Sequence, residues 1–388
     1  MGEWKQCTIA DLGMVITGKT PSTKITELWD GTVHFVTPKD IQGLKHITNT
    51  ERRITDAGLQ KVKGSALPPR AVCVSCIGNI GYTGMTTQKC VTNQQINSII
   101  VNSDNDPDFV YYLMRYLWPF FKNYEGQSTT LSILNKTQFS KISVTVPDKA
   151  TQKRIAEVLS ALDEKIAANA RINDNLQQQA LAIFQQEFLR EGELPDGWTS
   201  GSLLDIANYL NGLAMQKFRP ADGESGLPVL KIKELRQGSC DASSELCSPS
   251  IKPEYIVHDG DVIFSWSGSL LVDLWCGGTC GLNQHLFKVT SVKYPKWFYY
   301  AWTAHHLARF VAIAADKATT MGHIKREELA KAEVVIPDAA SMERIGGILQ
   351  PMYDIIISNR IENRKLAALR DTILPQLMSG ELDVSDLT

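Results

Sequence analysis

Two long stretches of this chain carry the same seven-residue ladder of apolar side chains, which constrains the fold more than any other feature. In residues 150–190, every seventh residue reads Ile155, Leu162, Asn169, Leu176 and Ile183. A start 190 positions later gives Ile345, Met352, Asn359, Leu366 and Ile373. Such a repeat is typical of helices packed along a seam, and a buried Asn on each helix can fix the register. We therefore expect two long helices that share a seam; the alternative is two ordinary amphipathic helices, each on its own domain.

Further apolar residues widen both ladders. They are Val158, Leu159, Ile166, Ile172 and Ala180 in the first stretch and Ile348, Leu349, Ile355, Ile356 and Leu369 in the second. The first stretch contains neither glycine nor proline, whereas the second contains Gly346, Gly347 and Pro351. Because proline lacks the amide hydrogen that a helix interior needs, we expect a kink or break near Pro351.

The rest of the chain is duplicated as well. Lys39-Asp40-Ile41 matches Lys233-Glu234-Leu235 at an offset of 194, and Asn93-Gln94 matches Asn283-Gln284 at an offset of 190. Offsets that drift but keep their order indicate a duplicated unit with loop insertions. Each copy is predicted to be one globular domain followed by one long helix. The predicted boundaries are residues 1–149 for the first domain, 150–190 for its helix, 191–338 for the second domain and 339–388 for the second helix and tail.

Each predicted domain mixes short strands with helices. Runs of β-branched residues bounded by Gly, Pro or Asn predict strands at 33–37, 71–75, 96–101 and 142–146, and in the second copy at 229–232, 262–265, 286–289 and 332–336. Apolar and aromatic residues at helical spacing predict helices at 109–124 and 297–315. The sequence therefore predicts α+β domains separated by helices, and not a doubly wound sheet.

Composition excludes several classes of protein. A chain of 388 residues can hold two domains or more, and its net charge of −2 is not that of a basic nucleic-acid coat. DNA binding by this chain requires locally concentrated basic residues or a partner that supplies part of the field. With no secretory signal and no apolar run long enough to span a membrane, we expect a cytoplasmic protein. Cys73, Cys76 and Cys90 lack a completing ligand pair, so the cysteines are interpreted as reduced thiols and no metal site is predicted.

One pattern suggests nucleotide chemistry. Residues 13–20 satisfy the phosphate-loop expression, but their interior is apolar, Pro21 follows directly, and the second copy lacks the Lys-Thr pair. The chain also lacks an Asn/Asp-Pro-Pro-aromatic motif, a glycine-rich cofactor loop and a His-Glu-x-x-His motif. The sequence therefore predicts a protein that reads a target and catalyses nothing. A phosphate-loop ATPase and a self-contained methyltransferase are the enzymatic alternatives.

A protein that reads DNA needs polar side chains on loops that a rigid scaffold holds. Gln and Asn can pair twice with adenine, Arg and Lys with guanine, and Ser, Thr and Lys with phosphates. The candidates in the first copy are Lys19, Thr20, Lys39, Ser75, Asn79, Gln94, Gln95, Ser128, Thr129, Thr130 and Lys136. Those in the second copy are Lys217, Lys231, Lys233, Ser267, Ser269, Gln284, His285, Thr319, Thr320, His323, Lys325 and Arg326. Asn93 occurs in both copies and is equally well explained by turn structure, whereas the change from Gln95 to His285 suits divergent reading.

Several motifs follow one another in a recognisable order. They are Gly18-Lys19-Thr20-Pro21, Asn93-Gln94, Pro147-x4-Gln152-x2-Ile155, Leu194-Pro195-x-Gly197-Trp198 and, most tellingly, Leu374-Pro375-Gln376-Leu377-Met378-Ser379-Gly380-Glu381-Leu382. In this order, and with the duplication, the chain resembles the DNA-specificity subunits of Type I restriction–modification enzymes. The resemblance covers essentially the whole chain.

The resemblance implies two target-recognition domains held apart by two long helices that form an antiparallel coiled coil, with a pseudo-twofold internal repeat. It implies a non-catalytic subunit that reads a bipartite, asymmetric site in double-stranded DNA, in a system of DNA methylation and host defence. The helices are expected to dock two modification subunits, and restriction/translocase subunits complete the complex. S-adenosylmethionine, ATP and Mg are expected on those partners, and no cofactor on this chain. The alternative is a specificity subunit of a related system in which methyltransferase and nuclease are fused in one partner.

Overall fold

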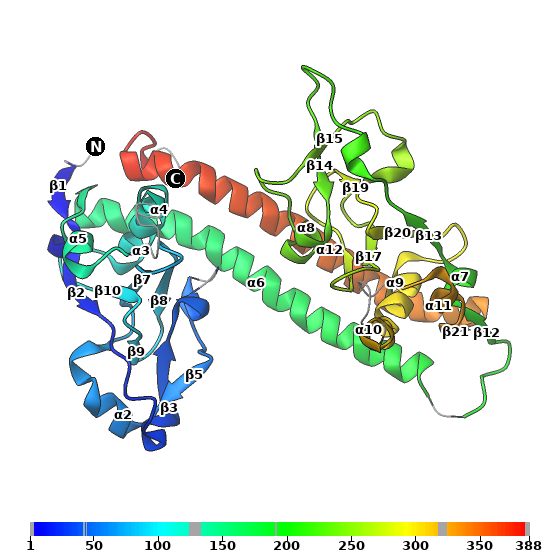
Figure 1. Ribbon diagram of the computed structural model, residues 1–388, viewed down its shortest axis with the longest axis horizontal. Helices are drawn as coiled ribbons and strands as arrows, with labels where there is room; N and C mark the ends of the chain where they lie inside the picture. The colour runs from blue at the N-terminus through cyan, green and yellow to red at the C-terminus, as the bar shows by residue number, and fades with distance from the viewer. Residues whose placement is uncertain are drawn as a thin grey trace. The chain divides into compact units, whose positions relative to one another are not determined.

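The computed structural model describes residues 4–41, 43, 45–123, 133–190, 192–316 and 324–384. They belong to two compact units (Figure 1). Unit 1 comprises Met1–Lys165 and Leu366–Thr388, and unit 2 comprises Ile166–Lys365. Each unit therefore contains one globular domain and a part of both long helices, α6 (Lys149–Phe188) and α12 (Ala339–Ser379).

The described strands of unit 1 form three sheets. The largest runs in the order β2 (Gly13–Thr17), β10 (Ile96–Val101), β7 (Val72–Ser75), β8 (Thr83–Thr86) and β4 (His46–Ile47). A second sheet runs β5 (Arg52–Ile54), β3 (Trp29–Val36), β9 (Cys90–Thr92) and β6 (Ala66–Leu67), and β1 (Lys5–Thr8) pairs with β11 (Ser143–Val146). The pairs are antiparallel except β3–β9 and β4–β8.

Short helices cover these sheets. They are α1 (Ile9–Leu12), α2 (Asp56–Lys61), α3 (Pro107–Tyr116), α4 (Trp118–Lys122) and α5 (Lys136–Ser140), with 3-10 turns η1 (Thr26–Leu28), η2 (Pro38–Ile41) and η3 (Lys63–Ser65). All of these α-helices except α2 share a core with the long helices. Fully buried Phe109 and Phe139 lie in one apolar core with Ile155 of α6 and Leu377 of α12. The domain of unit 1 is thus fixed to both helices by buried apolar contacts, the main stabilising term in folding.

Unit 2 repeats this arrangement. Its sheets run β13 (Asn208–Asn211), β20 (Leu286–Thr290), β17 (Val262–Ser265) and β18 (Leu271–Leu274); then β15 (Leu246–Cys247), β14 (Leu227–Leu230), β19 (Cys280–Leu282) and β16 (Ile256–Val257); and β12 (Thr199–Ser202) with β21 (Glu333–Ile336). Its other helices are α7 (Leu203–Ile206), α8 (Ile232–Gln237), α9 (Lys296–His305), α10 (Leu307–Asp316) and α11 (Arg326–Ala330), with η4 (Met215–Lys217) and η5 (Pro253–Tyr255).

The duplication extends to strand pairing. The parallel pair β3–β9 places Phe35 opposite Val91, and the parallel pair β14–β19 places Val229 opposite Gly281. These residues are related by the offsets of 194 and 190 seen in the sequence. The antiparallel pair β10–β7 likewise matches β20–β17. The duplicated α+β architecture predicted from the sequence is therefore confirmed.

The two long helices run antiparallel. In unit 1, Leu159 near the start of α6 shares a core with Leu374 near the end of α12. In unit 2, Phe184 near the end of α6 shares a core with Ile345 near the start of α12. Every rung of the two heptad ladders is buried or partly buried, so the ladders do mark the packed faces.

Four Asn side chains join the helices within unit 2. Asn169 Nδ2 donates to Asn363 Oδ1 at 2.9 Å, and Asn359 Nδ2 donates to Asn173 Oδ1 at 2.9 Å. Asn173 Nδ2 also donates to the carbonyl of Ile356, and Asn363 Nδ2 to that of Ile166. The offset of 190 exchanges the two helices in each of these pairs, so the contacts are reciprocal. The rung residues Asn169 and Asn359 therefore pair across the seam with the Asn one turn beyond the opposite rung, and not with each other.

Some sequence expectations about the helices are wrong. Ile172, Ile348, Ile355 and Leu369 do not widen the packed face, because 46–49% of each side chain is exposed. The break expected near Pro351 does not occur, because helix α12 continues through that residue, and the kink stays a prediction. Leu349 and Tyr353, on either side of Pro351, are both buried in the unit 2 core, and this packing holds the helix together despite the missing amide hydrogen.

The helices predicted at 109–124 and 297–315 are each two helices. The first divides at Leu117 between α3 and α4, where Pro119 in the first turn of α4 lacks the amide hydrogen that would continue α3. The second divides at His306 between α9 and α10. There His306 Nε2 donates to the carbonyl of Glu333 at 2.8 Å.

Candidate functional site

The turn between β9 and β10 presents Gln94 at its tip. Asn93 fixes this turn, since its Oδ1 accepts from the amide of Gln95 at 3.1 Å and its Nδ2 donates to Gln95 Oε1 at 2.8 Å. The amide of Asn93 donates to the carbonyl of Val36, which ties the turn to the end of β3. Gln94 is exposed. Asn93 therefore has a structural role, and Gln94 is the side chain that the turn offers to a ligand.

Gly18 brings a second loop against this turn. A Cβ on Gly18 would lie 2.2 Å from the carbonyl oxygen of Asn93, so no larger residue fits there. Two residues later, Thr20 Oγ1 donates to Gln94 Oε1 at 2.6 Å. Lys19 between them is exposed. The close approach at Gly18 thus places Thr20 against Gln94, next to an exposed lysine in the chain.

The loop after β7 completes this arrangement. Ser75 is fully buried; its hydroxyl donates to the carbonyl of Asn79 at 2.6 Å and accepts from the amide of Tyr82 at 2.9 Å. We therefore correct its assignment: Ser75 shapes the loop and has no hydroxyl to offer a ligand, whereas Asn79 is exposed. The amide of Cys76 donates to Gln95, and its carbonyl accepts from Leu134, just before exposed Lys136. We call residues 18–20, 75–82, 93–95 and 133–136 the first loop cluster.

The second copy builds the same frame. Asn283 Oδ1 accepts from the amide of His285 at 3.2 Å, and Asn283 Nδ2 donates to Gln284 Oε1 at 2.8 Å. A Cβ on Gly212 would lie 2.2 Å from the carbonyl oxygen of Asn283. The carbonyl of Trp266 accepts from the amide of Ile324, as that of Cys76 does from Leu134. We call residues 212–217, 265–269, 283–285 and 324–326 the second loop cluster.

Different side chains occupy this common frame in the second copy. Ser267, 3% exposed, places its Oγ 3.1 Å from His285 Nδ1, so it holds the imidazole ring and is not itself presented. Trp266 donates from Nε1 to Asn211 Oδ1 at 3.0 Å, and its ring centroid lies 6.3 Å from that of His285. Ser269 is exposed, and its carbonyl accepts from the hydroxyl of Ser265. His285 thus stands where the first copy has Gln95, with both residues partly exposed.

The predicted cations fall into two groups. The exposed group, for which the described contacts include no ion pair, consists of Lys19, Lys136, Lys217, Lys325 and Arg326. The other three are engaged: Lys39 lies 3.8 Å from Glu51, Lys231 pairs with Glu245, and Lys233 lies 3.5 Å from Asp241. The first group is available to an anionic ligand as it stands. Lys231 and Lys233 are available only if a carboxylate is displaced, whereas Lys39 is held loosely, since its side chain is 80% exposed.

Six of the predicted site residues lie outside the described residues. They are Ser128, Thr129, Thr130, Thr319, Thr320 and His323. Their assignment stays a prediction.

The phosphate-loop pattern has another explanation in the structure. Its first five residues form strand β2, with Gly13 opposite Val101 of β10, and Gly18 packs on the Asn93 turn. A strand in a sheet leaves no ring of amides free to surround a phosphate. Within the described ranges, no group of His, Cys, Asp or Glu side chains has the arrangement of a metal site. No helix in those ranges is both apolar enough and long enough to cross a membrane.

Sequence reasoning missed three residues that the structure brings to the second loop cluster or beside it. Trp266 carries a sequence signal, because it replaces Cys76 at the offset of 190 in a loop already selected. Glu245 has one too, since it matches Glu51 at the offset of 194. Arg219 lies in a loop without a clear counterpart, and its contact with Glu245 at 3.1 Å required the structure.

Comparisons with known proteins agree with this architecture. A family model described as the Type I restriction modification DNA specificity domain matches residues 1–178 and again residues 195–368. Over 421 residues, the chain is 26% identical to the Type I restriction enzyme MjaIX specificity subunit of Methanocaldococcus jannaschii, with 99% of this chain and 95% of that relative covered. It is 30% identical over 175 residues to the HindI specificity subunit of Haemophilus influenzae, which covers 45% of this chain and 38% of the relative.

A solved structure supports the fold. The crystal structure of the S subunit of a Type I restriction–modification system from M. genitalium matches with a TM-score of 0.62 and 14% identity, over 97% of this chain and 96% of that one. The family model covers both copies of the repeat, together with most of each long helix. The resemblance stated from the sequence is thereby confirmed, and the chain belongs to the Type I restriction–modification DNA specificity family.

Proposed function

We propose that this chain is the non-catalytic subunit that selects the DNA sequence for a Type I restriction–modification complex in the cytoplasm. Each domain reads one part of a bipartite, asymmetric site in double-stranded DNA. The observation that carries the proposal is a pair of loop clusters with one backbone frame and different presented side chains. Gln94 and Gln95 stand in the first cluster where Gln284 and His285 stand in the second.

The chemistry of these side chains suits base edges and phosphates. A glutamine amide can donate and accept at once, which matches the paired N6 and N7 groups of adenine in the major groove. Exposed lysines such as Lys19 and Lys217 can contact phosphates and set the position of the domain without reading sequence. Because corresponding positions differ, the two half-sites are expected to differ, and the target is asymmetric.

Catalysis and cofactors are assigned to partners in this proposal. The antiparallel helices offer exposed apolar side chains, among them Ile172, Ile348 and Ile355, which are 46% exposed. Such side chains on a helix surface suit helix-to-helix contacts with a protein partner. We assign this surface to two modification subunits that bind S-adenosylmethionine and methylate adenine. Restriction/translocase subunits would bring ATP and Mg for translocation and cleavage.

A domain exchange tests the proposal. The full chain is expressed with its modification subunits in a host without adenine methylation, and the methylated sites are mapped by sequencing. Residues 1–148 are then replaced by the equivalent domain of a relative with a different target. We expect one half of the methylated site to change while the other half stays. An exchange that leaves the site unchanged, or that changes both halves, would contradict the assignment of one half-site to each domain.

A further inference from the structure

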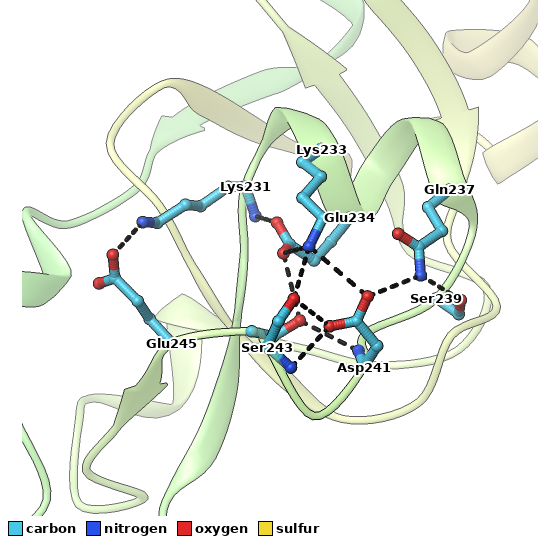
Figure 2. A network of polar contacts seen from close by, with 9 residues as sticks. Lys231, Lys233, Glu234, Gln237, Ser239, Asp241, Ser243 and Glu245 are labelled. Carbon is cyan, nitrogen blue, oxygen red and sulfur yellow. Dashed lines mark hydrogen bonds and ion pairs between the residues drawn. The ribbon is translucent and has the colours of Figure 1, made fainter. Parts of the chain in front are cut away.

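A loop of unit 2 supplies carboxylates to basic residues beside the second loop cluster. We call residues 239–245 the acidic segment. Figure 2 shows how its side chains meet those of Lys231 and Lys233. Glu245 pairs with Lys231 and also with Arg219, whose nitrogen lies 3.1 Å from the carboxylate. One carboxylate therefore serves two cations.

The same segment also engages Lys233. Lys233 Nζ donates to Ser243 Oγ at 2.8 Å and lies 3.5 Å from Asp241 Oδ2 (Figure 2). Asp241 in turn accepts from the hydroxyl of Ser243 at 2.6 Å and from Gln237 Nε2 at 3.2 Å. These bonds hold the acidic segment against both ends of the short helix α8, which fixes the position of the Asp241 carboxylate.

The paired cations lie at the end of the domain where the second loop cluster is built. Lys231 directly follows β14, and the carbonyl of Leu230 accepts from the amide of Asn283 in the cluster's central turn. Lys217 and Met215 belong to η4, and Met215 packs on Val229 of β14. A polyanion lying on the second loop cluster would therefore pass close to Lys231 and Arg219.

The pairs are exposed enough to be exchanged. The side chains of Lys231, Arg219 and Glu245 are 38%, 52% and 40% exposed. Exposed ion pairs are weak, and phosphate oxygens compete for the same Lys and Arg donors. The pKa of the Glu245 carboxyl is lowered, chiefly by the hydrogen bond from Lys231. The carboxylate is therefore charged near neutral pH.

We propose that Glu245 sets DNA specificity by holding Lys231 and Arg219 on its carboxylate, where only a correctly aligned DNA phosphate displaces it. The inference rests on the proposed function, since it takes the ligand of the second loop cluster to be DNA. Misaligned DNA finds both cations bound to the carboxylate, which cancels one of their two charges, and gains less from them. Aligned DNA brings a phosphate to the position of the carboxylate and gains both contacts.

The first domain provides a matched control. Glu51 is the counterpart of Glu245, and Lys39 is the counterpart of Lys233. The contact between Glu51 and Lys39 is 3.8 Å long, with side chains 66% and 80% exposed. Such a pair holds its lysine only loosely, so removing the charge of Glu51 should release little.

The experiment uses the full chain in complex with its modification subunits and measures DNA affinity across a salt series. The probes are a duplex that carries the mapped methylation site and a duplex of equal length without it. For Glu245→Gln we expect tighter binding of the non-cognate duplex. The slope of log affinity against log salt should steepen by about 0.9, because the variant removes one negative charge from beside the two cations. The preference for the cognate duplex should fall, and Glu51→Gln should behave as the wild type.

Lys231→Gln supplies the opposite test. It should weaken binding of the cognate duplex and flatten its salt slope by about 0.9, because one phosphate contact is lost. Binding of the non-cognate duplex should weaken less, because Lys231 is bound there to the Glu245 carboxylate, which cancels one of the two positive charges. A merely structural pair would instead give both variants lower thermal stability and equal losses on the two duplexes, which would overturn the proposal.

The wild-type complex separates this inference from the proposed function. If the wild type does not prefer the cognate duplex, the proposed function fails. If the wild type discriminates and Glu245→Gln matches it in affinity and salt slope, the role of Glu245 is disproved while the proposed function stands.

Discussion

At the scale of single residues, two glutamines occupy equivalent tips of equivalent turns. The side chains of Asn93 and Asn283 form hydrogen bonds within the turn. Gln94 is exposed in one domain, and Gln284 is partly exposed in the other. The frame is therefore duplicated, and the presented neighbours differ. Recognition at this scale is expected to be local to one half-site.

Replacing Gln94 by Leu should relax one half of the site only. Leu keeps the size of the side chain but removes the donor and acceptor, and a lost two-bond base contact costs about 1–3 kcal/mol in discrimination. Methylation mapping with the variant should show a degenerate position in one half-site. Gln284→Leu is the matched control and should relax the other half. Relaxation of the same half by both variants would disprove the assignment.

Sequence patterns identified the turn residues but not their accessibility. Asn93 and its repeat are interpretable because Asn commonly caps a turn with its own side chain. The sequence predicts Ser75 and Ser267 as site residues because each is a polar residue beside a loop. Their burial follows from hydrogen bonds to Asn79 and His285, and these depend on how the loop folds back. Tertiary hydrogen bonds of this kind produce no periodic pattern in the sequence, so the sequence does not predict them.

At the scale of elements, each domain is fastened to the helices by polar contacts that the repeat does not share. In unit 1, Arg370 of α12 and Tyr112 of α3 both bind Asp163 of α6, at 2.6 Å each. In unit 2, Arg364 of α12 binds Asp259 through two nitrogens at 2.8 Å each. The two domains therefore have distinct attachments within one common architecture.

Arg364→Met should destabilise unit 2 in a pH-dependent manner. The hydrogen bond from Arg364 is the main cause that lowers the pKa of the Asp259 carboxyl in the folded chain. The stability from this pair is thus present above the unfolded pKa of about 4 and is lost as pH falls through the lower folded value. At pH 7 we expect Tm to fall by about 2–4 °C, the effect of about 1 kcal/mol in a unit of this size.

Thermal unfolding followed by fluorescence of buried Trp275 and Trp297 measures this change. The gap in Tm between wild type and Arg364→Met should narrow as pH falls below about 4, where Asp259 is protonated in the unfolded chain, and should close once the pH is also below the lower pKa of Asp259 in the folded wild type. Arg364→Lys keeps the charge but loses the two-point contact, so an intermediate Tm is expected. A gap that stays constant down to pH 3 would show that packing, and not the ion pair, is what the substitution removes.

Most elements were predictable because their signals are local. The heptad ladders gave both long helices, and β-branched runs gave strands such as β7, β10 and β17. The division between α3 and α4 could also be predicted from Pro119, since proline is common in the first turn of a helix. The aromatic periodicity of this stretch instead favours one continuous helix. The continuity of α12 through Pro351 could not be predicted from the sequence. It depends on Leu349 and Tyr353 being buried against the domain.

At the scale of the whole molecule, each long helix is divided between the two compact units. The boundary lies after Lys165 in α6 and after Lys365 in α12. We propose that the length of helix between the two domains sets the unread spacer in the DNA site. One extra turn of helix adds about 6 Å, close to two base-pair steps of DNA. Contacts inside each unit do not depend on the residues inserted at these boundaries.

Inserting four residues after Lys165 and four after Lys365 should therefore lengthen the spacer and leave both half-sites intact. Methylation mapping gives the spacer and the half-sites in one experiment. A four-residue insertion after Gly223, which lies in a loop of unit 2, should leave the spacer as it was. An unchanged spacer after the double insertion, in a complex that still methylates DNA, would exclude the helices as its determinant.

The reciprocal pairing of four Asn side chains has an evolutionary consequence. Asn169 depends on Asn363, and Asn173 depends on Asn359, across two halves that descend from one ancestral segment. Substitutions in the loops of one half do not affect the contacts of the other half, so the loops of the two halves can change independently. At these four sites, by contrast, a substitution in one half removes a hydrogen bond from an amide in the other half, so surviving lineages should change them in matched pairs or retain all four.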